Sequence, residues 1–288
     1  MLEYKAFKKL FMEELNQRKE ESEHLDFRKL YKVNQQLDAL VIMKQSKENR
    51  NTAGEPVFYL NDLFNAYLNG QSIDSLVSEV LMKSEMDIPK DVMMHGSLTL
   101  ETLKTKIYPQ IINREHNRCF LEYAAYTTMP GLDLAVIYRM VFSEDQNGSM
   151  SSIVPWELIR EWEIPVEELH EIALHNMEEN RTYQIGYFPA PPEIGPMIYL
   201  SDDTSRFGAA QVLSNHALKI AEEIFEGSFF ILPSSLHEVV LLKYVKEKVE
   251  SYKAMVREIN REVVSPEDWL SDQVYYYDAE DKQVKMAA

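Results

Sequence analysis

One short segment of the sequence brings a hydroxyl, an imidazole and a carboxylate close together. Residues 233–238 read PSSLHE, and a serine, a histidine and an acid form the catalytic set of many hydrolases. These groups must also meet in space beside donors for the oxyanion, and neighbouring residues of a strand point to opposite faces. The pattern therefore favours a turn between two strands, with His237 on a packed face. A hydrolase that uses Ser234 or Ser235 with His237 is the alternative.

A second segment, residues 202–208 (DDTSRFG), links a predicted strand to a predicted helix. Such turns often hold anionic ligands, because free N–H groups collect at the start of a helix. Arg206 adds a planar guanidinium that can bind an anion. Neither glycine-rich phosphate-binding motif occurs, so helix capping is the competing interpretation. The candidate ligand-binding residues of the two segments are Arg206, Phe207, Gly208, Ser234, Ser235 and His237.

A histidine pair in a predicted helix raises the question of a metal site. His170 and His175 are five residues apart, whereas the zinc-binding pair of many metalloproteases is four apart. Five residues turn a helix by about 500°, which leaves the two rings about 140° apart. We predict no metal, no cofactor and no recognisable catalytic set. Cys119 is the single cysteine, which excludes an internal disulfide and favours a reducing compartment, the cytoplasm.

The charge is unevenly divided along the chain. The net charge is −17, and the rows give 18 Lys+Arg against 22 Asp+Glu in residues 1–150 and 12 against 25 in residues 151–288, or −4 and −13. This sign opposes binding to nucleic acid and to anionic membranes. No stretch reaches the roughly 20 apolar residues of a membrane helix, and the first residues do not read as a signal peptide. The excess acid either keeps the protein dissolved or meets a basic protein partner. The eight acids of residues 155–179 also raise the possibility of a nucleic-acid mimic.

Hydrophobic periodicity predicts a mixture of helices and strands. Helices are expected over residues 2–22, 61–70, 72–81, 155–162, 165–177, 209–225 and 247–262, the second and third capped by Asn61 and Ser72. Strands are expected over residues 37–43, 57–60, 107–113, 120–127, 132–142, 150–154, 197–200, 229–232, 236–242 and 274–277. Residues 37–60 are expected to form a hairpin. The strand at 132–142 is expected to be central, because both of its faces are largely apolar. Four prolines make residues 187–196 an extended connector, and a polar tail follows residue 277.

The expected fold class is α+β, with mostly antiparallel sheets packed by helices and a helical N-terminal region. Three regions are expected: 1–95, helical with a small hairpin; 96–186, an antiparallel sheet with acidic helices; and 187–288, an α/β subdomain that forms one compact unit with the second region. The oligomeric state is not encoded in any pattern that we recognise.

Several phrases of the sequence resemble a known family. They are YLNDLF at 59–64 with Tyr67, IYL at 198–200 running to FGAA at 207–210, FILPSSLHEV at 230–239, and VREIN at 256–260 leading to SDQVY at 271–275. They resemble an uncharacterised domain-of-unknown-function family known chiefly from anaerobic Gram-positive gut bacteria and their mobile elements. The resemblance covers residues 34–277 and implies a bacterial cytosolic protein, with no catalytic residue to carry over. With no catalytic motif and an acidic second half, the prediction is a non-enzymatic binding or regulatory module.

Overall fold

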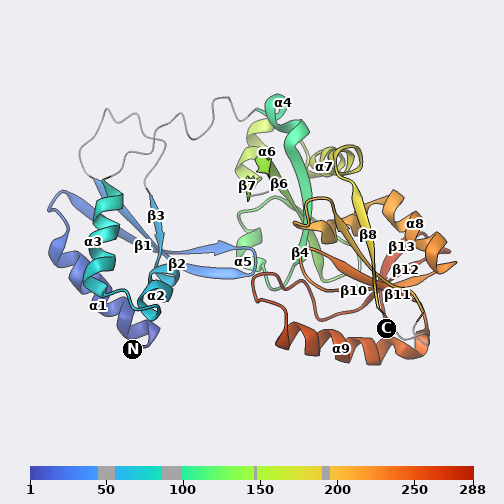
Figure 1. The fold of residues 1–288 in the computed structure, drawn as a ribbon. Coiled ribbons are helices and arrows are strands. Elements are labelled where there is room, and N and C mark those ends of the chain that lie inside the picture. Colours follow the sequence, from blue (N-terminus) through green and yellow to red (C-terminus); the bar gives the residue numbers. More distant parts are fainter. Residues whose placement is uncertain (45–55, 86–98, 146–147, 190–194) are drawn as a thin grey trace. The chain divides into compact units, whose positions relative to one another are not determined.

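The chain forms two units of unequal size. The computed structural model describes residues 1–44, 56–85, 99–145, 148–189 and 195–288, and its contacts divide the chain into Met1–Ser97 and Leu98–Ala288 (Figure 1). Every pairing between the strands it describes is antiparallel. The predicted α+β class, with antiparallel sheets and an N-terminal helix, is therefore confirmed. Within these residues, no helix has both the length and the apolar character needed to cross a membrane.

The first unit packs three helices on a small sheet (Figure 1). Its elements are α1 (Tyr4–Arg18), β1 (Glu23–Lys32), β2 (Gln35–Lys44), β3 (Val57–Tyr59), α2 (Leu60–Leu68) and α3 (Ile73–Ser84). The strand order is β1-β2-β3. Leu40 and Ile42 are two residues apart on β2, so they share a face, and they form one core with Phe7 and Phe11 of α1 and Leu76 of α3. Hydrophobic burial on that one face holds the unit together.

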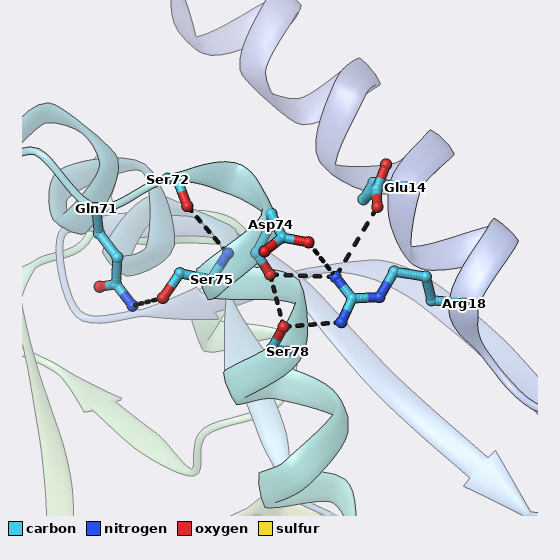
Figure 2. A network of polar contacts seen from close by, with 7 residues as sticks. All are labelled: Glu14, Arg18, Gln71, Ser72, Asp74, Ser75 and Ser78. Carbon is cyan, nitrogen blue, oxygen red and sulfur yellow. Dashed lines mark hydrogen bonds and ion pairs between the residues drawn. The ribbon is translucent and has the colours of Figure 1, made fainter.

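A polar cluster ties the end of α1 to the start of α3 (Figure 2). Arg18 donates from Nη1 to the backbone oxygen and the carboxylate of Asp74, and from Nη2 to the hydroxyl of Ser78. Ser72 accepts a hydrogen bond from the backbone N–H of Ser75, which confirms its predicted role as the N-cap of α3. The cluster lies at the surface, so it orients the two helices more than it stabilises them.

The second unit contains two sheets and the remaining helices. Its elements before β8 are α4 (Leu100–Leu103), η2 (Lys104–Lys106), β4 (Ile107–Asn113), α5 (Arg118–Leu121), β5 (Tyr126–Thr128), β6 (Leu134–Asp145), β7 (Gly148–Ile153), α6 (Trp156–Trp162) and α7 (Val166–Asn180). The others are β8 (Tyr183–Phe188), β9 (Met197–Asp202), η3 (Gly208–Leu213), α8 (Asn215–Phe225), β10 (Phe229–Pro233), β11 (Val239–Lys243), η4 (Lys246–Lys248), α9 (Val249–Glu262), β12 (Tyr275–Asp278) and β13 (Gln283–Met286).

The four-stranded sheet is centred on β6. This strand pairs with β4 along one edge and with β5 and then β7 along the other. Its residues from Leu134 to Tyr138 are all buried, which confirms the predicted central strand. Helix α7 packs on β4 and β5, and the amide of Asn176 donates to the backbone oxygens of Lys104 and Ile107. This helix is thereby fixed over the start of β4.

The six-stranded sheet has the order β13-β12-β10-β11-β9-β8 and is covered on both faces. Phe230 of β10 packs with Tyr252 and Val256 of α9. The preceding residue, Phe229, points the other way and stacks on Phe225 of α8. The two helices therefore cover opposite faces of one strand.

Several element predictions were wrong for local reasons. The predicted strand at residues 120–127 is replaced by the end of the helical turn α5 and the start of the short strand β5. Phe120 and Leu121 are both buried, whereas a strand would point their side chains to opposite faces. The predicted helix 209–225 begins as a 3-10 segment, and Ser214 caps the true helix α8. Asn61 does not cap α2, because its side chain accepts from the backbone N–H of Asp38.

Three strands of the structure, β1, β8 and β13, also differ from the prediction. The hairpin partner β1 was not predicted, since its exposed charges mask its half-buried face. Strand β8 occupies residues assigned in part to the connector. The predicted polar tail forms β13, and Ala287 after it is buried in the core under α9. The pairing of β2 with β3, by contrast, confirms the predicted hairpin.

A single carboxylate links the two sheets of the second unit. Asp133, just before β6, accepts hydrogen bonds from the Asn113 amide at 2.8 Å, the Ser271 hydroxyl at 2.8 Å and the Tyr275 hydroxyl at 2.6 Å. Burial is the main cause that raises the pKa of Tyr275 above its ordinary range, and the neighbouring Asp133 carboxylate adds to it. The tyrosine therefore stays a neutral donor to a charged acceptor, which is the stronger kind of hydrogen bond.

Replacing Asp133 by asparagine tests this link. The amide places an N–H₂ group where donors now converge, so we expect D133N to lower the free energy of unfolding by about 2–3 kcal/mol, and Y275F by about half as much. All three tryptophans, Trp156, Trp162 and Trp269, lie in the second unit, so tryptophan fluorescence in urea reports on that unit. Tyr276→Phe on the neighbouring position is the control and should change the stability by less than about 0.5 kcal/mol. Equal values for D133N and Y276F would contradict the link.

Candidate functional site

A pocket in the second unit is lined by side chains from both of its sheets. Arg139 comes from β6 and Arg181 follows α7. Arg206 and Phe207 lie in the turn between β9 and η3, and Gly208 is the first residue of η3. We call this the arginine pocket, after Arg139, Arg181 and Arg206. Its cavity volume is about 40 Å³, which corresponds to about three water molecules by the same measure. The three candidate residues of the 202–208 segment thus line one small cavity.

The turn that carries Arg206 and Phe207 has an uncommon backbone. Ser205 and Phe207 have φ values of 53° and 58°, in the left-handed region that side chains other than glycine disfavour by about 1–2 kcal/mol. Hydrogen bonds hold this conformation. Asp202 accepts from the backbone N–H of Thr204 at 3.0 Å and from its hydroxyl at 2.8 Å, and that hydroxyl accepts from the N–H of Arg206 at 3.2 Å. Strain of this kind persists only where the surroundings over-determine it, as they do at many functional sites.

His237 holds the same turn from the other side. Its Nδ1 accepts the backbone N–H of Phe207 at 3.2 Å, so the proton of the neutral ring lies on Nε2, which donates to Asp268 at 3.1 Å. The two rings, Phe207 and His237, are 5.7 Å apart. Both nitrogens of the imidazole are therefore used in positioning the turn.

The two serines of the 233–238 segment do not engage the imidazole. Ser234 donates to Glu238 at 3.3 Å, and the Ser235 hydroxyl accepts from the backbone N–H of His237 at 3.0 Å. Neither serine lines the arginine pocket. Since a serine hydrolase needs the ring nitrogen on the hydroxyl, this geometry gives no support to the hydrolase alternative. The segment serves the pocket through His237 alone.

Gly208 lets the turn lie directly against β9. A Cβ at this position would lie 2.5 Å from the backbone nitrogen of Asp202 and 2.7 Å from the backbone oxygen of His237, and closer still to the hydroxyl of Ser201. The Ser201 hydroxyl itself donates to that His237 oxygen at 2.7 Å. The glycine is thus required by close approach of three chain segments.

Arg139 carries the charge that the pocket leaves uncompensated. Its Nε donates to Gln110 at 2.6 Å and its Nη1 to the Ser151 hydroxyl at 2.7 Å, and its guanidinium lies 4.4 Å from the centre of the Phe207 ring. No carboxylate in the described part of the chain lies within ion-pair distance of it. Burial lowers the pKa of Arg139 to about 10, so it is charged at neutral pH. A partly buried cation without a counterion costs free energy that a bound anion would recover.

The other two arginines share a carboxylate. Arg181 contacts Glu144 at 2.6 Å, and its guanidinium lies 4.5 Å from the centre of the Tyr108 ring. Arg206 lies 3.8 Å from the same Glu144. The remaining charge is Asp202, which is buried, and burial raises the pKa of its carboxyl. Among the described residues, three guanidinium groups and two carboxylates line the pocket, which leaves one positive charge when all are ionised.

Arg139 and Arg181 were missed by the sequence reasoning. Arg139 lies on the second face of the strand that the sequence predicts to be central, and no ligand role was assigned to it there. The sequence could have indicated Arg139 as a functional residue. Arginine is almost never buried without a partner, and a strand that is covered on both faces would keep its side chain from solvent. Arg181 follows an acidic helix and gave no pattern at all.

The other candidates lie away from this pocket. His170 lies against the Tyr138 hydroxyl at 3.1 Å, and burial lowers its pKa, while His175 is exposed. Cys119 is exposed. The segments that the structure describes contain no group of three potential metal ligands. The acids of α6 and α7 form no ion pair within those segments, and a basic partner for them stays a prediction.

Comparison with known proteins identifies the family. A model of DUF5688, a family of unknown function, matches residues 4–190 and 189–279. The chain belongs to the DUF5688 family. No curated protein and no solved structure matches it. The arginine pocket of this DUF5688 member lies within the matched residues, so the family assignment leaves its chemistry to be argued from the pocket itself.

Gly208→Ala tests whether the turn depends on its contact with β9. Overpacking against backbone atoms cannot be relieved by side-chain rotation, so we expect a loss of about 3 kcal/mol in the free energy of unfolding, followed by tryptophan fluorescence in urea. Gly131→Ala is the control: its φ is 74° with open space around it, so it should cost only about 1 kcal/mol. S201A added to G208A should not restore stability, because the backbone contacts remain; a full rescue would contradict the steric argument.

Proposed function

We propose that this chain is a non-enzymatic binding protein whose ligand site is the arginine pocket. The observation that carries the proposal is Arg139, a partly buried guanidinium that lines a cavity with no carboxylate partner in the described residues. A structural arginine in this environment is normally paired. An unpaired one at a cavity is a site prepared for an anion that arrives from outside.

Three further features support binding. The centre of the Phe207 ring lies 4.4 Å from the Arg139 guanidinium and restricts its position, which reduces the entropy lost when a ligand binds. The strained turn is held by Asp202 and His237 before any ligand arrives, so the site is pre-organised. Gln110 positions Arg139: its Oε1 accepts from the Nε–H of Arg139 at 2.6 Å, and the residue is fully buried.

A non-enzymatic role fits the groups at the pocket better than catalysis does. Among the described residues that line it, none is a histidine, a cysteine or a lysine. Its hydroxyls include Ser151, which is already bonded to Arg139, and Thr204, which is bonded to Asp202. A nucleophile needs an adjacent base. The Thr204 hydroxyl has one in Asp202, but it also accepts from the backbone N–H of Arg206 and so is engaged in holding the turn. The pocket is equipped to hold an anion and not to attack it.

Native mass spectrometry tests the proposal. The purified chain, incubated with the small-molecule fraction of a bacterial extract, should retain at least one ligand mass that Arg139→Met does not retain. Arg160→Met is the control, because it makes the same charge change on the exposed face of α6, away from the pocket. The ligand should be released unchanged in mass after prolonged incubation. A changed mass would indicate catalysis, and no mass dependent on Arg139 would remove the proposal.

Asp202→Asn tests the electrostatics of the pocket. The asparagine Oδ1 can still accept from Thr204, whereas a negative charge that repels an anionic ligand is lost, so we expect about tenfold tighter binding of the retained ligand at neutral pH. The raised pKa of Asp202 also predicts in which direction the stability changes with pH. Ionisation of this buried carboxyl costs free energy, so wild-type stability should fall relative to D202N as pH rises above 3.8, the ordinary value, through the raised folded value.

The control for this pair of measurements is Asp203→Asn. Asp203 is the next residue and is exposed, so it carries the same charge change without facing the pocket. Its stability difference from the wild type should stay nearly constant over the pH range in which D202N diverges. Parallel pH profiles for D202N and D203N would show that the Asp202 carboxyl is not strained by burial.

A further inference from the structure

The free donors, net charge and size of the arginine pocket restrict its ligand further, an inference that rests on the binding function proposed above. A guanidinium has five N–H donors, and Arg139 uses one on Gln110 and one on Ser151. Three donors are left, on Nη1 and Nη2, and the described residues offer them no further acceptor. Two N–H groups of one plane match the two oxygens of a carboxylate.

The net charge of the pocket favours a monoanion. Glu144 already neutralises the Arg181 and Arg206 pair in part, at 2.6 Å and 3.8 Å, and Asp202 adds a second negative charge. Three positive and two negative groups leave one charge to be matched. A phosphate monoester, which is largely dianionic near neutral pH, would leave an uncompensated negative charge next to Glu144 and Asp202.

The size of the cavity also favours a small anionic group. A volume of about 40 Å³ holds roughly three to four non-hydrogen atoms. This is enough for a carboxylate and its first carbon, and too little for a whole metabolite. The rest of the ligand must therefore lie outside the cavity.

We infer that the arginine pocket binds a carboxylate group at the end of a larger molecule, paired with the guanidinium of Arg139. The Phe207 ring lies against the guanidinium, and the buried amide of Gln110 accepts from its Nε–H. Arg139 then gives up little side-chain freedom when the carboxylate arrives. Specificity for the rest of the molecule comes from contacts beyond the cavity.

The test compares two small probes of nearly equal shape. Acetate and acetamide have the same number of non-hydrogen atoms, but only acetate is charged. In titrations at constant ionic strength, followed by the ¹H–¹⁵N resonance of the Arg139 Nε–H, acetate should produce a saturable shift with a millimolar dissociation constant. Acetamide should produce none, and inorganic phosphate should bind at least about tenfold more weakly than acetate.

Variants distinguish the contribution of the planar guanidinium to acetate binding from the contribution of its charge. Arg139→Lys keeps a positive charge but loses the planar fork, and we expect it to weaken acetate binding about tenfold, as followed by the backbone amide of Phe207. Arg160→Met should bind acetate as the wild type does. Asp202→Asn should bind acetate more tightly, which keeps the test valid if changes at Arg139 disturb folding.

The outcomes also separate this inference from the proposed function. Equal shifts with acetate and acetamide, or acetate binding unchanged in R139K, would overturn the carboxylate inference. Phosphate binding that depends on Arg139, with no response to acetate, would overturn it as well and leave the pocket as a binding site. If no probe binds and no mass is retained through Arg139, both the inference and the proposed function fail.

Discussion

The hydrogen bond from the backbone N–H of Phe207 to Nδ1 of His237 joins two turns that are thirty residues apart. It fixes the left-handed conformation of Phe207, and the placement of that ring then determines where the Arg139 guanidinium can lie. Gly208 belongs to the same constraint, because only a residue without a Cβ allows the turn to touch β9 and His237 together. The arginine pocket is therefore a product of turn geometry, and its charge depends on that geometry for its position.

Two partly buried charges of the second unit, Asp133 and Arg139, differ in how the protein stabilises them. Asp133 is surrounded by three neutral donors, Asn113, Ser271 and Tyr275, which satisfy it completely enough to link two sheets. Arg139 has a carbonyl oxygen, a hydroxyl and an aromatic face, none of them charged. A group that only stabilises the fold is satisfied within it. The difference between these two sites is the physical reason to regard Asp133 as structural and Arg139 as functional.

The sequence predicted what depends on local periodicity and local caps. The central strand β6 follows from its two apolar faces, and the cap of α3 follows from Ser72 at the start of an amphipathic pattern. What it missed depends on partners distant in the chain. Strand β1 has too many charges to stand out until β2 pairs with it. Strand β13 has no buried residue of its own, and it is followed by Ala287, which reaches the core under α9.

The same distinction applies to the pocket. Residues 206–208 and His237 drew attention through separate local patterns, one as an anion-binding turn and one as part of a reactive trio. Their direct contact follows from the pairing of β9 with β11, which lies outside any local window. Arg139 and Arg181 join them from β6 and the end of α7, more than twenty residues earlier. Convergence of three arginines is a property of the fold, and sequence spacing does not encode it.

The acidity of the whole chain bears on what such a pocket can hold. With a net charge of −17, the protein's field repels anions at long range, and the repulsion grows with the charge of the ligand. A polyanion would meet that field over its whole length, whereas a single carboxylate meets it once and then enters a cavity whose local charge is positive. The field of the protein and the size of the cavity therefore select against the same ligands. Both favour a small monoanionic group over nucleic acid or a polyphosphate, and salt should weaken this discrimination because it screens the distant charges more than the nearby guanidinium.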